Sequence, residues 1–413
     1  MSHQEILLAR QPILDRERVV VAYELLFRNA EWAPELRPEG DAGDRATSQV
    51  LLNAFEELDI AAVTGEQPAY VNFTRQLILN PPPFDHERIV IEVLEDVEVD
   101  DLLLAKLGSL RAQGYTIALD DFVYRPELEA LVQLADVIKF DIRAHDDAAL
   151  VAQLGLVRRS GLRLLAKKVE TNAEFERCRE LGFDYFQGYF FARPEQLSGR
   201  RMPASRLSVL RLVAALQAPD ATFEQVRDVI AADPPLSFKL LKLVNSAALR
   251  GGSEITSLQA AVALLGLDRV RSWASLLALS KLTDKSPALS VTTLVRAHLC
   301  EAVGRSALQG APAEDYFIAG LLSTIDAYFD RTMAEVVKEL PVAAPIQRAL
   351  VRHGGKLGAI LRACIDYERG AFEAIRWWEL EALGITPQLL EAHYREALRV
   401  ADIAANLLGE ASH

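Results

Sequence analysis

Two adjacent carboxylates, Asp120 and Asp121, end the run YTIALDDF at Tyr115–Phe122. The run is short, apolar and β-branched, which is typical of a buried strand. In a parallel barrel or an open α/β sheet, the carboxyl ends of the strands form the functional face. Neighbouring carboxylates repel each other unless a cation lies between them, so the pair is a candidate metal site. A turn or a helix N-cap also favours aspartate, and the dipeptide alone does not decide.

Further polar residues recur at the ends of other strand-like runs, where an apolar core does not require them. They are Glu24, Arg28, Asn72, Glu92, Lys139 and Gln187. Carboxylate and amide oxygens suit Mg²⁺, Mn²⁺ or Ca²⁺, and the lysine and arginine suit phosphate oxygens. Taken singly, each residue has an alternative role in a buried ion pair or a cap.

Composition narrows the class of protein. The chain has 413 residues, half of them apolar and a quarter charged, which is enough for two globular domains. A net charge of -13 argues against non-specific binding to nucleic acid and against binding to an anionic membrane surface. The three cysteines are far apart, and neither a signal peptide nor a membrane span is evident. We therefore expect a soluble cytoplasmic protein without a membrane partner.

The first half of the chain alternates short strand-like runs with helical patterns, which indicates a parallel sheet covered by helices. Eight runs suggest a closed barrel, and the short turn after the first run indicates an antiparallel first pair. The predicted strands are Ile6–Leu14, Val19–Arg28, Ala69–Phe73, Ile89–Leu94, Tyr115–Asp120, Val137–Asp141, Leu162–Ala166 and Tyr185–Gln187. The predicted helices include Ala46–Leu58, Asp101–Gln113, Ala148–Ser160 and Asn172–Leu181, the last with Gly182 as its C-cap.

The second half shows only helical patterns, so we expect an all-α domain. We predict domains at 1–197 and 206–413 with a linker at 198–205, in a stretch punctuated by proline and glycine. The predicted helices are Leu207–Gln217, Thr222–Ala232, Leu236–Leu249, Leu258–Leu265, Asp268–Lys281, Leu294–Gln309 and Asp315–Ser323. The fold class is thus multidomain, with a TIM-like (β/α)8 barrel followed by helices.

Taken in order, the polar residues of the first half resemble the EAL domain, the barrel of bacterial cyclic-di-GMP phosphodiesterases. The resemblance covers about residues 5 to 197. It implies metal ligands at Glu24, Asn72, Glu92, Asp120 and Asp121, and it matches Lys139 and Gln187 to the family's lysine and strand-eight glutamine. With Arg28, these two are the candidate nucleotide-binding residues.

Two departures from that family stand out. The motif AEGVET is here Ala166–Thr171, AKKVET, so the glutamate that would bind a second metal and help to activate water is Lys167. The DDFGxG loop also loses both glycines at Asp121–Arg125. An ammonium group in a ligand shell competes with a cation. We therefore expect no catalytic residues and no enzyme, with weak residual activity not excluded.

The second half resembles the HDOD domain, a helical relative of HD phosphohydrolases. The motifs are Asp233–Leu236, Leu243–Ala247 and Ile255–Leu258. Ser323 and Thr324 stand where an HD enzyme has its His-Asp pair, and we expect His298 to be a packed histidine.

The two resemblances together imply an EAL–HDOD signalling protein of bacteria with an output such as motility. We expect a regulatory protein that senses cyclic-di-GMP or binds proteins through its HDOD domain, with homodimerisation left open. No cofactor should be required, and Mg²⁺ or Mn²⁺ should bind weakly at most. The alternatives are an active metal-dependent cyclic-di-GMP phosphodiesterase, working with one metal or with Glu170 as a substitute ligand, and a scaffold without nucleotide binding.

Overall fold

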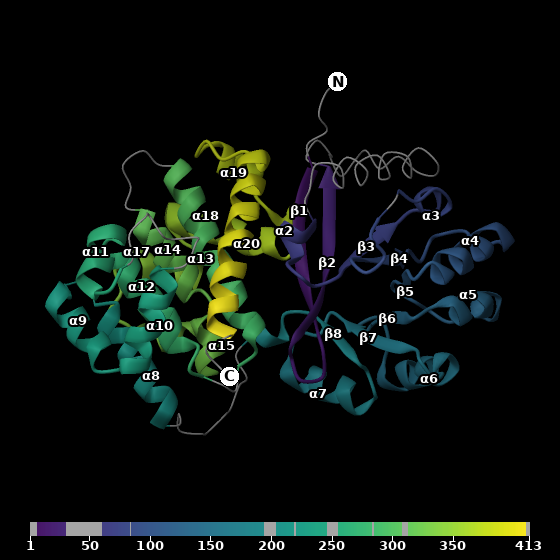
Figure 1. Ribbon diagram of the computed structural model, residues 1–413, viewed down its shortest axis with the longest axis horizontal. Coiled ribbons are helices and arrows are strands. Elements are labelled where there is room, and N and C mark those ends of the chain that lie inside the picture. Colours follow the sequence, from purple (N-terminus) through teal and green to yellow (C-terminus); the bar gives the residue numbers. More distant parts are fainter. Residues whose placement is uncertain are drawn as a thin grey trace. The chain divides into compact units, whose positions relative to one another are not determined.

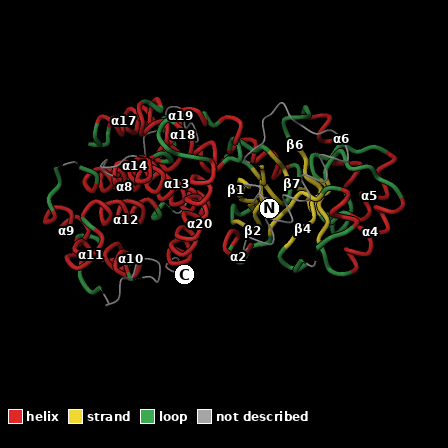
Figure 2. The backbone as a smooth tube through the Cα atoms, turned by 90° about the horizontal axis from the view of Figure 1, so that it is seen from above, coloured by secondary structure: helices red, strands yellow, loops and turns green. Residues whose placement is uncertain are grey.

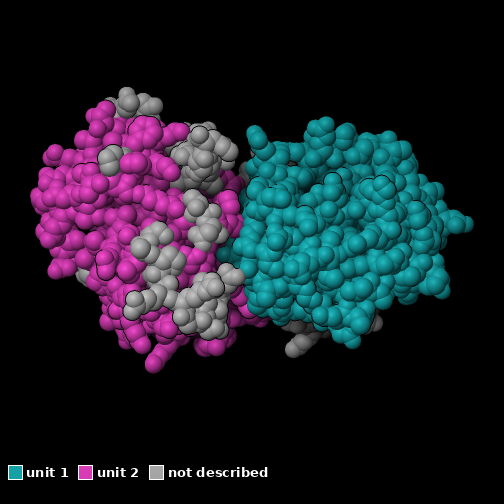
Figure 3. Space-filling model, turned by 90° about the horizontal axis from the view of Figure 1, so that it is seen from below, with its two compact units in different colours: residues 1–191 teal, residues 192–413 magenta. Residues whose placement is uncertain are grey.

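The computed structural model describes residues 6–29, 60–82, 84–193, 204–218, 220–245, 255–282, 285–307 and 313–409. The chain divides into two compact units, Met1–Phe191 and Ala192–His413, which Figure 3 shows in different colours. The predicted helix Ala46–Leu58 and nearly all of the predicted linker lie outside the described residues.

The first unit is a closed barrel of eight strands in sequence order, as predicted (Figures 1 and 2). Its strands are β1 (Ile6–Leu14), β2 (Val20–Asn29), β3 (Ala69–Phe73), β4 (Ile89–Val93), β5 (Thr116–Leu119), β6 (Val137–Asp141), β7 (Arg163–Lys167) and β8 (Tyr185–Gln187). Strand β1 is antiparallel to both β2 and β8, and all other neighbours are parallel. The seventh strand ends one residue later than predicted, so Lys167 belongs to it.

Strands β1 and β2 form the longest pair of the barrel. Their register runs from Ile6 opposite Asn29 to Leu14 opposite Val20, whereas β3 pairs with β2 only from Tyr23 to Leu25. The two-stranded ribbon therefore continues past the carboxyl end of β3. In Figure 1 it is the pair of long purple arrows.

Short helices connect the parallel strands and lie outside the barrel wall (Figure 2). They are α2 (Ile60–Thr64), α3 (Arg75–Leu79), α4 (Asp101–Ala112), α5 (Glu129–Leu134), α6 (Asp147–Val157) and α7 (Asn172–Glu180), with a 3₁₀ turn at Pro126–Leu128. Helix α7 begins with a capping box between Thr171 and Glu174. It ends before Gly182, whose φ of 87° is the left-handed conformation expected of a C-cap glycine.

The barrel interior contains one layer of packed apolar residues. Its members are Ile13, Ala22, Tyr70, Val90, Ala118, Val137 and Leu165, with Tyr185 and Val21 packed against them. Seven of the eight strands contribute a buried member, which fills the barrel as side-chain layers do in such folds.

The second unit is helical throughout the residues described, as predicted. Its helices are α8 (Ala204–Leu216), α9 (Phe223–Ala231), α10 (Pro234–Val244), α11 (Leu258–Leu265), α12 (Leu267–Leu279), α13 (Pro287–Ala307), α14 (Ala313–Leu322), α15 (Ile325–Phe329), α16 (Met333–Lys338), α17 (Ala344–Arg352), α18 (Gly355–Glu368), α19 (Trp377–Glu381) and α20 (Pro387–Gly409). Thr222 starts α9 with a capping box to Gln225. Within the described ranges, no helix combines the length and the apolar character needed to cross a bilayer.

Candidate active site

A ring of polar residues lies directly above the apolar layer of the barrel. Each member is two residues from an apolar member on its own strand, and side chains two apart on a strand share one face. The pairs are Ala22 and Glu24, Tyr70 and Asn72, Val90 and Glu92, Ala118 and Asp120, Val137 and Lys139, Leu165 and Lys167, Tyr185 and Gln187. Strand β1 runs the other way, so Gln11 precedes Ile13. We call these eight residues the polar ring.

Lys139 is the centre of the polar ring. Its side chain is fully buried, and its Nζ lies 2.9 Å from Glu24 Oε2 and 3.3 Å from Asp120 Oδ1. It also donates a short hydrogen bond to Glu92 Oε1. One ammonium group thus joins three carboxylates from β2, β4 and the end of β5.

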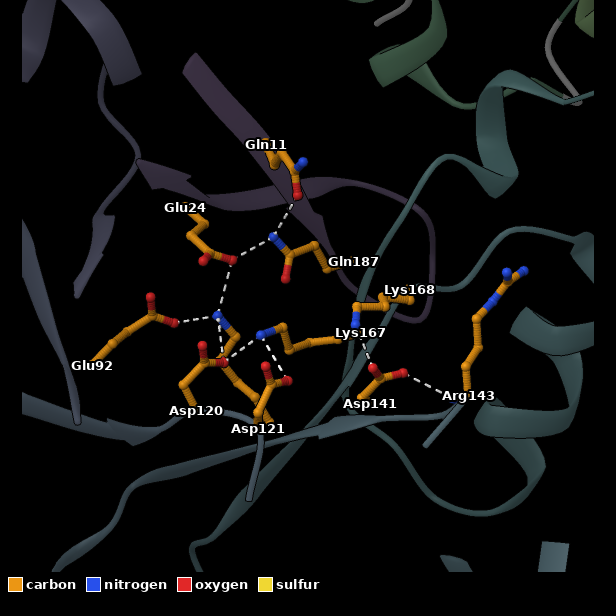
Figure 4. Close-up of polar contacts among 11 residues, drawn as sticks. Gln11, Glu24, Glu92, Asp120, Asp121, Asp141, Arg143, Lys167, Lys168 and Gln187 are labelled. Carbon is orange, nitrogen blue, oxygen red and sulfur yellow. Dashed lines mark hydrogen bonds and ion pairs between the residues drawn. The ribbon is translucent and has the colours of Figure 1, made fainter. Parts of the chain in front are cut away.

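A second ammonium group, that of Lys167, lies among the carboxylates that follow β5 (Figure 4). Its Nζ is 2.6 Å from Asp120 Oδ1 and 2.9 Å from Asp121 Oδ1. The backbone is left-handed at Asp121 and at Lys168, with φ of 41° and 60°. Non-glycine residues seldom take this conformation, and functional sites are where such strain concentrates.

Gln187 and Gln11 complete the polar ring on the side of β1 and β8. The Nε2 of Gln187 donates to Glu24 Oε2 at 2.5 Å and to Gln11 Oε1 at 3.1 Å (Figure 4). Gln187 is followed by Gly188, where an added Cβ would lie 1.9 Å from the carbonyl oxygen of Val169. This close approach holds the loop after Lys167 against β8, and only glycine permits it.

Burial and neighbouring charges set the protonation of the polar ring. Burial raises the pKa of Glu92 to about 8, although Lys139 acts in the opposite direction. Burial alone would raise the pKa of Asp120, but Lys139 and Lys167 outweigh it and hold that pKa below its usual value. Burial alone would lower the pKa of both lysines, but the carboxylates outweigh it and raise each pKa. Both ammonium groups are therefore charged at neutral pH.

Three buried oxygens in the polar ring have no hydrogen-bond partner, namely Asn72 Oδ1, Glu92 Oε2 and Gln187 Oε1. Of these residues, Asn72 and Glu92 are paired in register on β3 and β4. Unsatisfied buried acceptors are rare in native proteins and need an explanation, such as an ion. The oxygens of Asn72 and Glu92 are hard donors of the kind that Mg²⁺, Mn²⁺ and Ca²⁺ prefer, so these residues fit such a cation.

The carboxylates are not arranged around an empty centre, because Lys139 and Lys167 lie between them. Accordingly, the described residues contain no set of three or more acidic, histidine or cysteine side chains poised to hold a metal. A cation would have to share these carboxylates with the two ammonium groups.

The structure thus brings Glu24, Asn72, Glu92, Lys139 and Gln187 into one site with Asp120, Asp121 and Lys167. Strand β2 includes Arg28, but its side chain lies outside what the structure describes. Gln11 was missed, since a lone glutamine in a first strand carries no motif. The signal that could have found it is its spacing of two from Ile13 on an antiparallel strand.

The second unit has hydroxyl groups at the position of the HD pair. Thr324 Oγ1 lies 2.7 Å from Thr293 Oγ1, and Ser323 Oγ accepts from Arg296 Nη1 at 3.0 Å. His298 is buried between Trp273 and Phe317, at centroid distances of 5.5 and 5.1 Å. It packs as predicted.

A closed (β/α) barrel with a carboxylate-rich ring at the carboxyl ends of its strands, followed by a helical unit, is the architecture of an EAL barrel joined to an HDOD domain. Comparison with protein families agrees, since the EAL domain matches residues 44–194 and the HDOD domain matches residues 202–343. The chain belongs to the family of EAL–HDOD proteins.

Two relatives extend over nearly all of the chain. The "Cyclic di-GMP phosphodiesterase CdgJ" of Vibrio cholerae is 34% identical over 378 residues, covering 90% of this chain and 86% of the relative. The "Uncharacterized protein YuxH" of Bacillus subtilis is 34% identical over 359 residues, covering 84% of this chain and 87% of the relative. Among solved structures, the PaMucR phosphodiesterase in complex with c-di-GMP covers 49% of this chain and 99% of its own, with 24% identity and a TM-score of 0.38.

Our expectation that the chain is no enzyme is wrong, because a relative of this extent and identity is named a phosphodiesterase. That expectation rested on the ammonium group of Lys167 competing with a cation in the ligand shell. In the structure this ammonium group is paired with Asp120 and Asp121, and Asn72 Oδ1 and Glu92 Oε2 have no hydrogen-bond partner. A lysine at this position therefore does not by itself close the site.

Proposed function

We propose that the chain is a cyclic-di-GMP phosphodiesterase that works with a divalent cation. The observation that carries the proposal is the polar ring, in which Asn72 and Glu92, register partners on β3 and β4, each have a buried oxygen without a hydrogen-bond partner. The identity with the phosphodiesterase of Vibrio cholerae supports the choice of substrate.

The proposal assigns a role to each group of residues. Glu24, Asn72 and Glu92 would hold the cation, which when bound polarises a phosphoryl oxygen and lowers the pKa of a water molecule. Asp120 and Asp121 are paired with Lys167, and Lys139 holds Glu24, Glu92 and Asp120 in place. Gln187 orients Glu24 through its amide and, with Arg28 on β2, would contact the nucleotide.

The reaction opens one phosphodiester of the ring-shaped substrate. The oxygen of a water molecule forms a bond to phosphorus, and the bond between phosphorus and one ribose oxygen breaks. That oxygen leaves with a proton, and the second water proton is lost to solvent. The product is the linear dinucleotide with a terminal phosphate.

The test is to incubate the full chain with cyclic-di-GMP and Mn²⁺ and to separate the nucleotides by chromatography. The chain should form the linear dinucleotide, and chelation of the metal should stop the reaction. Glu24→Gln removes one charge from the polar ring and should lower the rate at least about 100-fold. Glu17→Gln makes the same change in an exposed turn and should keep the wild-type rate. No product from the wild-type chain would overturn the proposal.

We also propose that the helical unit binds protein partners. What supports this is Trp378 on α19, whose exposed fraction is 71%. Large aromatic side chains on a surface are frequent anchors of protein interfaces. Cross-linking at residue 378 in the full chain, through a photoreactive amino acid, should capture a discrete partner or a second copy. Absence of any cross-linked species in the native cell would contradict the proposal.

A further inference from the structure

We infer that Lys167 serves as a fixed positive charge in the polar ring, so that the site takes a single divalent cation. The inference rests on the proposed function, because it concerns the cation of that same site. It assigns to Lys167 the neutralisation of Asp120 and Asp121 and leaves the cation to the opposite side of the ring.

The position of Lys167 is a built feature of the barrel. The residue stands two positions after the buried Leu165, in the same layer as the other members of the polar ring. Its side chain is only 12% exposed, and its ammonium group contacts two carboxylates within 2.9 Å. The neighbouring Lys168 differs in each respect, since its side chain is 56% exposed and pairs with Asp141 outside the ring. A solvated lysine would resemble Lys168.

The balance of charges at the site is consistent with one bound divalent cation. With a cation bound and every carboxylate ionised, the ring members Glu24, Glu92 and Asp120 and the adjacent Asp121 bring four negative charges, and Lys139 and Lys167 bring two positive charges. The remaining two negative charges balance one divalent ion. A second ion would leave the buried site with two excess positive charges, and unbalanced charge in a poorly solvated site is costly.

The geometry places that ion on the side of β3 and β4. Asp120 Oδ1 is already shared by both ammonium groups, at 3.3 Å from Lys139 and 2.6 Å from Lys167. Of the unpartnered buried oxygens, that of Gln187 is an amide oxygen on β8 and that of Asp121 lies against Lys167, whereas those of Asn72 and Glu92 are paired in register on β3 and β4. Lys139 contacts carboxylates on both sides of the ring, but Lys167 contacts only those that follow β5, so the oxygens farthest from this second ammonium group are those on β3 and β4.

The experiment measures how many Mn²⁺ ions bind per full-length chain, by equilibrium dialysis with Mn²⁺ alone and without nucleotide. We expect one ion for the wild type. Lys167→Glu replaces the ammonium group with a carboxylate and should bind two. Lys168→Glu makes the same charge reversal one residue away and should still bind one. Lys167→Met adds no ligand and should bind one ion at least about tenfold more tightly, since a like charge is gone.

Several results would overturn the inference. They are two ions or none in the wild type, or one ion in Lys167→Glu when circular dichroism shows it folded. If Lys167→Glu does not fold, unchanged affinity in Lys167→Met overturns it as well. Failure of this inference can be told apart from failure of the proposed function. Hydrolysis of cyclic-di-GMP with two bound ions would overturn only the inference of a single cation. One bound ion without hydrolysis would overturn only the proposed phosphodiesterase activity.

Discussion

Asn72 and Glu92 lie directly opposite each other on β3 and β4, and each places a buried oxygen in the polar ring that no donor satisfies. Leaving such groups without a partner costs stability, of the order of 1 to 3 kcal/mol for each. Two unsatisfied oxygens on paired residues therefore indicate that this part of the barrel is less stable than it could be because it binds a ligand.

The first prediction concerns Asn72→Leu. The variant removes an unsatisfied buried oxygen, so the metal-free chain should be as stable as the wild type or more stable. Added Mn²⁺ should stabilise the wild type by about 2.7 kcal/mol at a hundredfold excess over its dissociation constant, and the variant much less. Thermal unfolding with and without Mn²⁺ measures both effects. Gln113→Leu, at an exposed position after α4, is the control and should keep the full response to metal.

The second prediction concerns Lys139→Met. Without the ammonium group, Glu24 and Glu92 would be buried without their counter-charge, and breaking a buried pair in this way costs about 3 to 5 kcal/mol. Urea unfolding of the barrel should show this loss. Lys106→Met, on the surface helix α4, should change stability by less than about 0.5 kcal/mol. A similar small effect at both positions would show that the buried ion pairs do not hold the polar ring together.

The third prediction concerns pH and the helical unit. Burial, assisted by Arg269, lowers the pKa of His298 to about 3. The unfolded chain binds a proton here at its ordinary pKa of about 6.5, while the folded chain stays neutral. The neutral His298 thus contributes to the free energy of unfolding above pH 6.5. This contribution falls by about 1.4 kcal/mol per pH unit as the pH is lowered from 6.5 towards 3.

The check is to follow unfolding by tryptophan fluorescence, because Trp273 packs against His298. His298→Phe should lose stability less steeply between pH 6.5 and pH 3 than the wild type does. Equal slopes in the two proteins would mean that His298 is not the group that takes up the proton.

The fourth prediction uses the glycine after β8. In Gly188→Ala, the new Cβ would meet the carbonyl oxygen of Val169 at 1.9 Å, so the loop that follows Lys167 must move. We expect a loss of stability of at least about 2 kcal/mol and a strong loss of hydrolysis. Gly155→Ala lies in α6 with no atom within 4 Å of the added Cβ, and it should be neutral or slightly stabilising. Normal stability of Gly188→Ala would count against the loop's role.

Much of the fold could be predicted from the sequence. Strands such as Val137–Asp141 are short apolar runs flanked by turn residues, and their period fixes which residues face inward. Glu24, Asn72, Glu92, Asp120 and Lys139 could be assigned to one site because each stands near the end of a strand-like run and because, in this order, they resemble the EAL domain. The helices of the second unit followed from their caps, as at Thr222.

What could not be predicted is which charges pair with which. The sequence shows that Lys167 is a lysine but not that Asp120 and Asp121 bind its ammonium group, because that contact joins strands 47 residues apart. The resemblance did place Lys167 in the ligand shell, although the predicted seventh strand ended one residue before it. It gave no information on which carboxylates the ammonium group contacts.

The ribbon of β1 and β2 has a consequence for how a ligand would be enclosed. From Glu24 the ribbon runs on to Asn29, beyond the level of the polar ring, with Ile6 opposite its tip. It is therefore a rim standing on one side of the site mouth, built from backbone pairing that the ring does not depend on. Lengthening or shortening both strands by two residues would change the height of this rim while keeping the inward faces in register. The length of β1 and β2 can thus change the depth of the site without changing the residues of the polar ring.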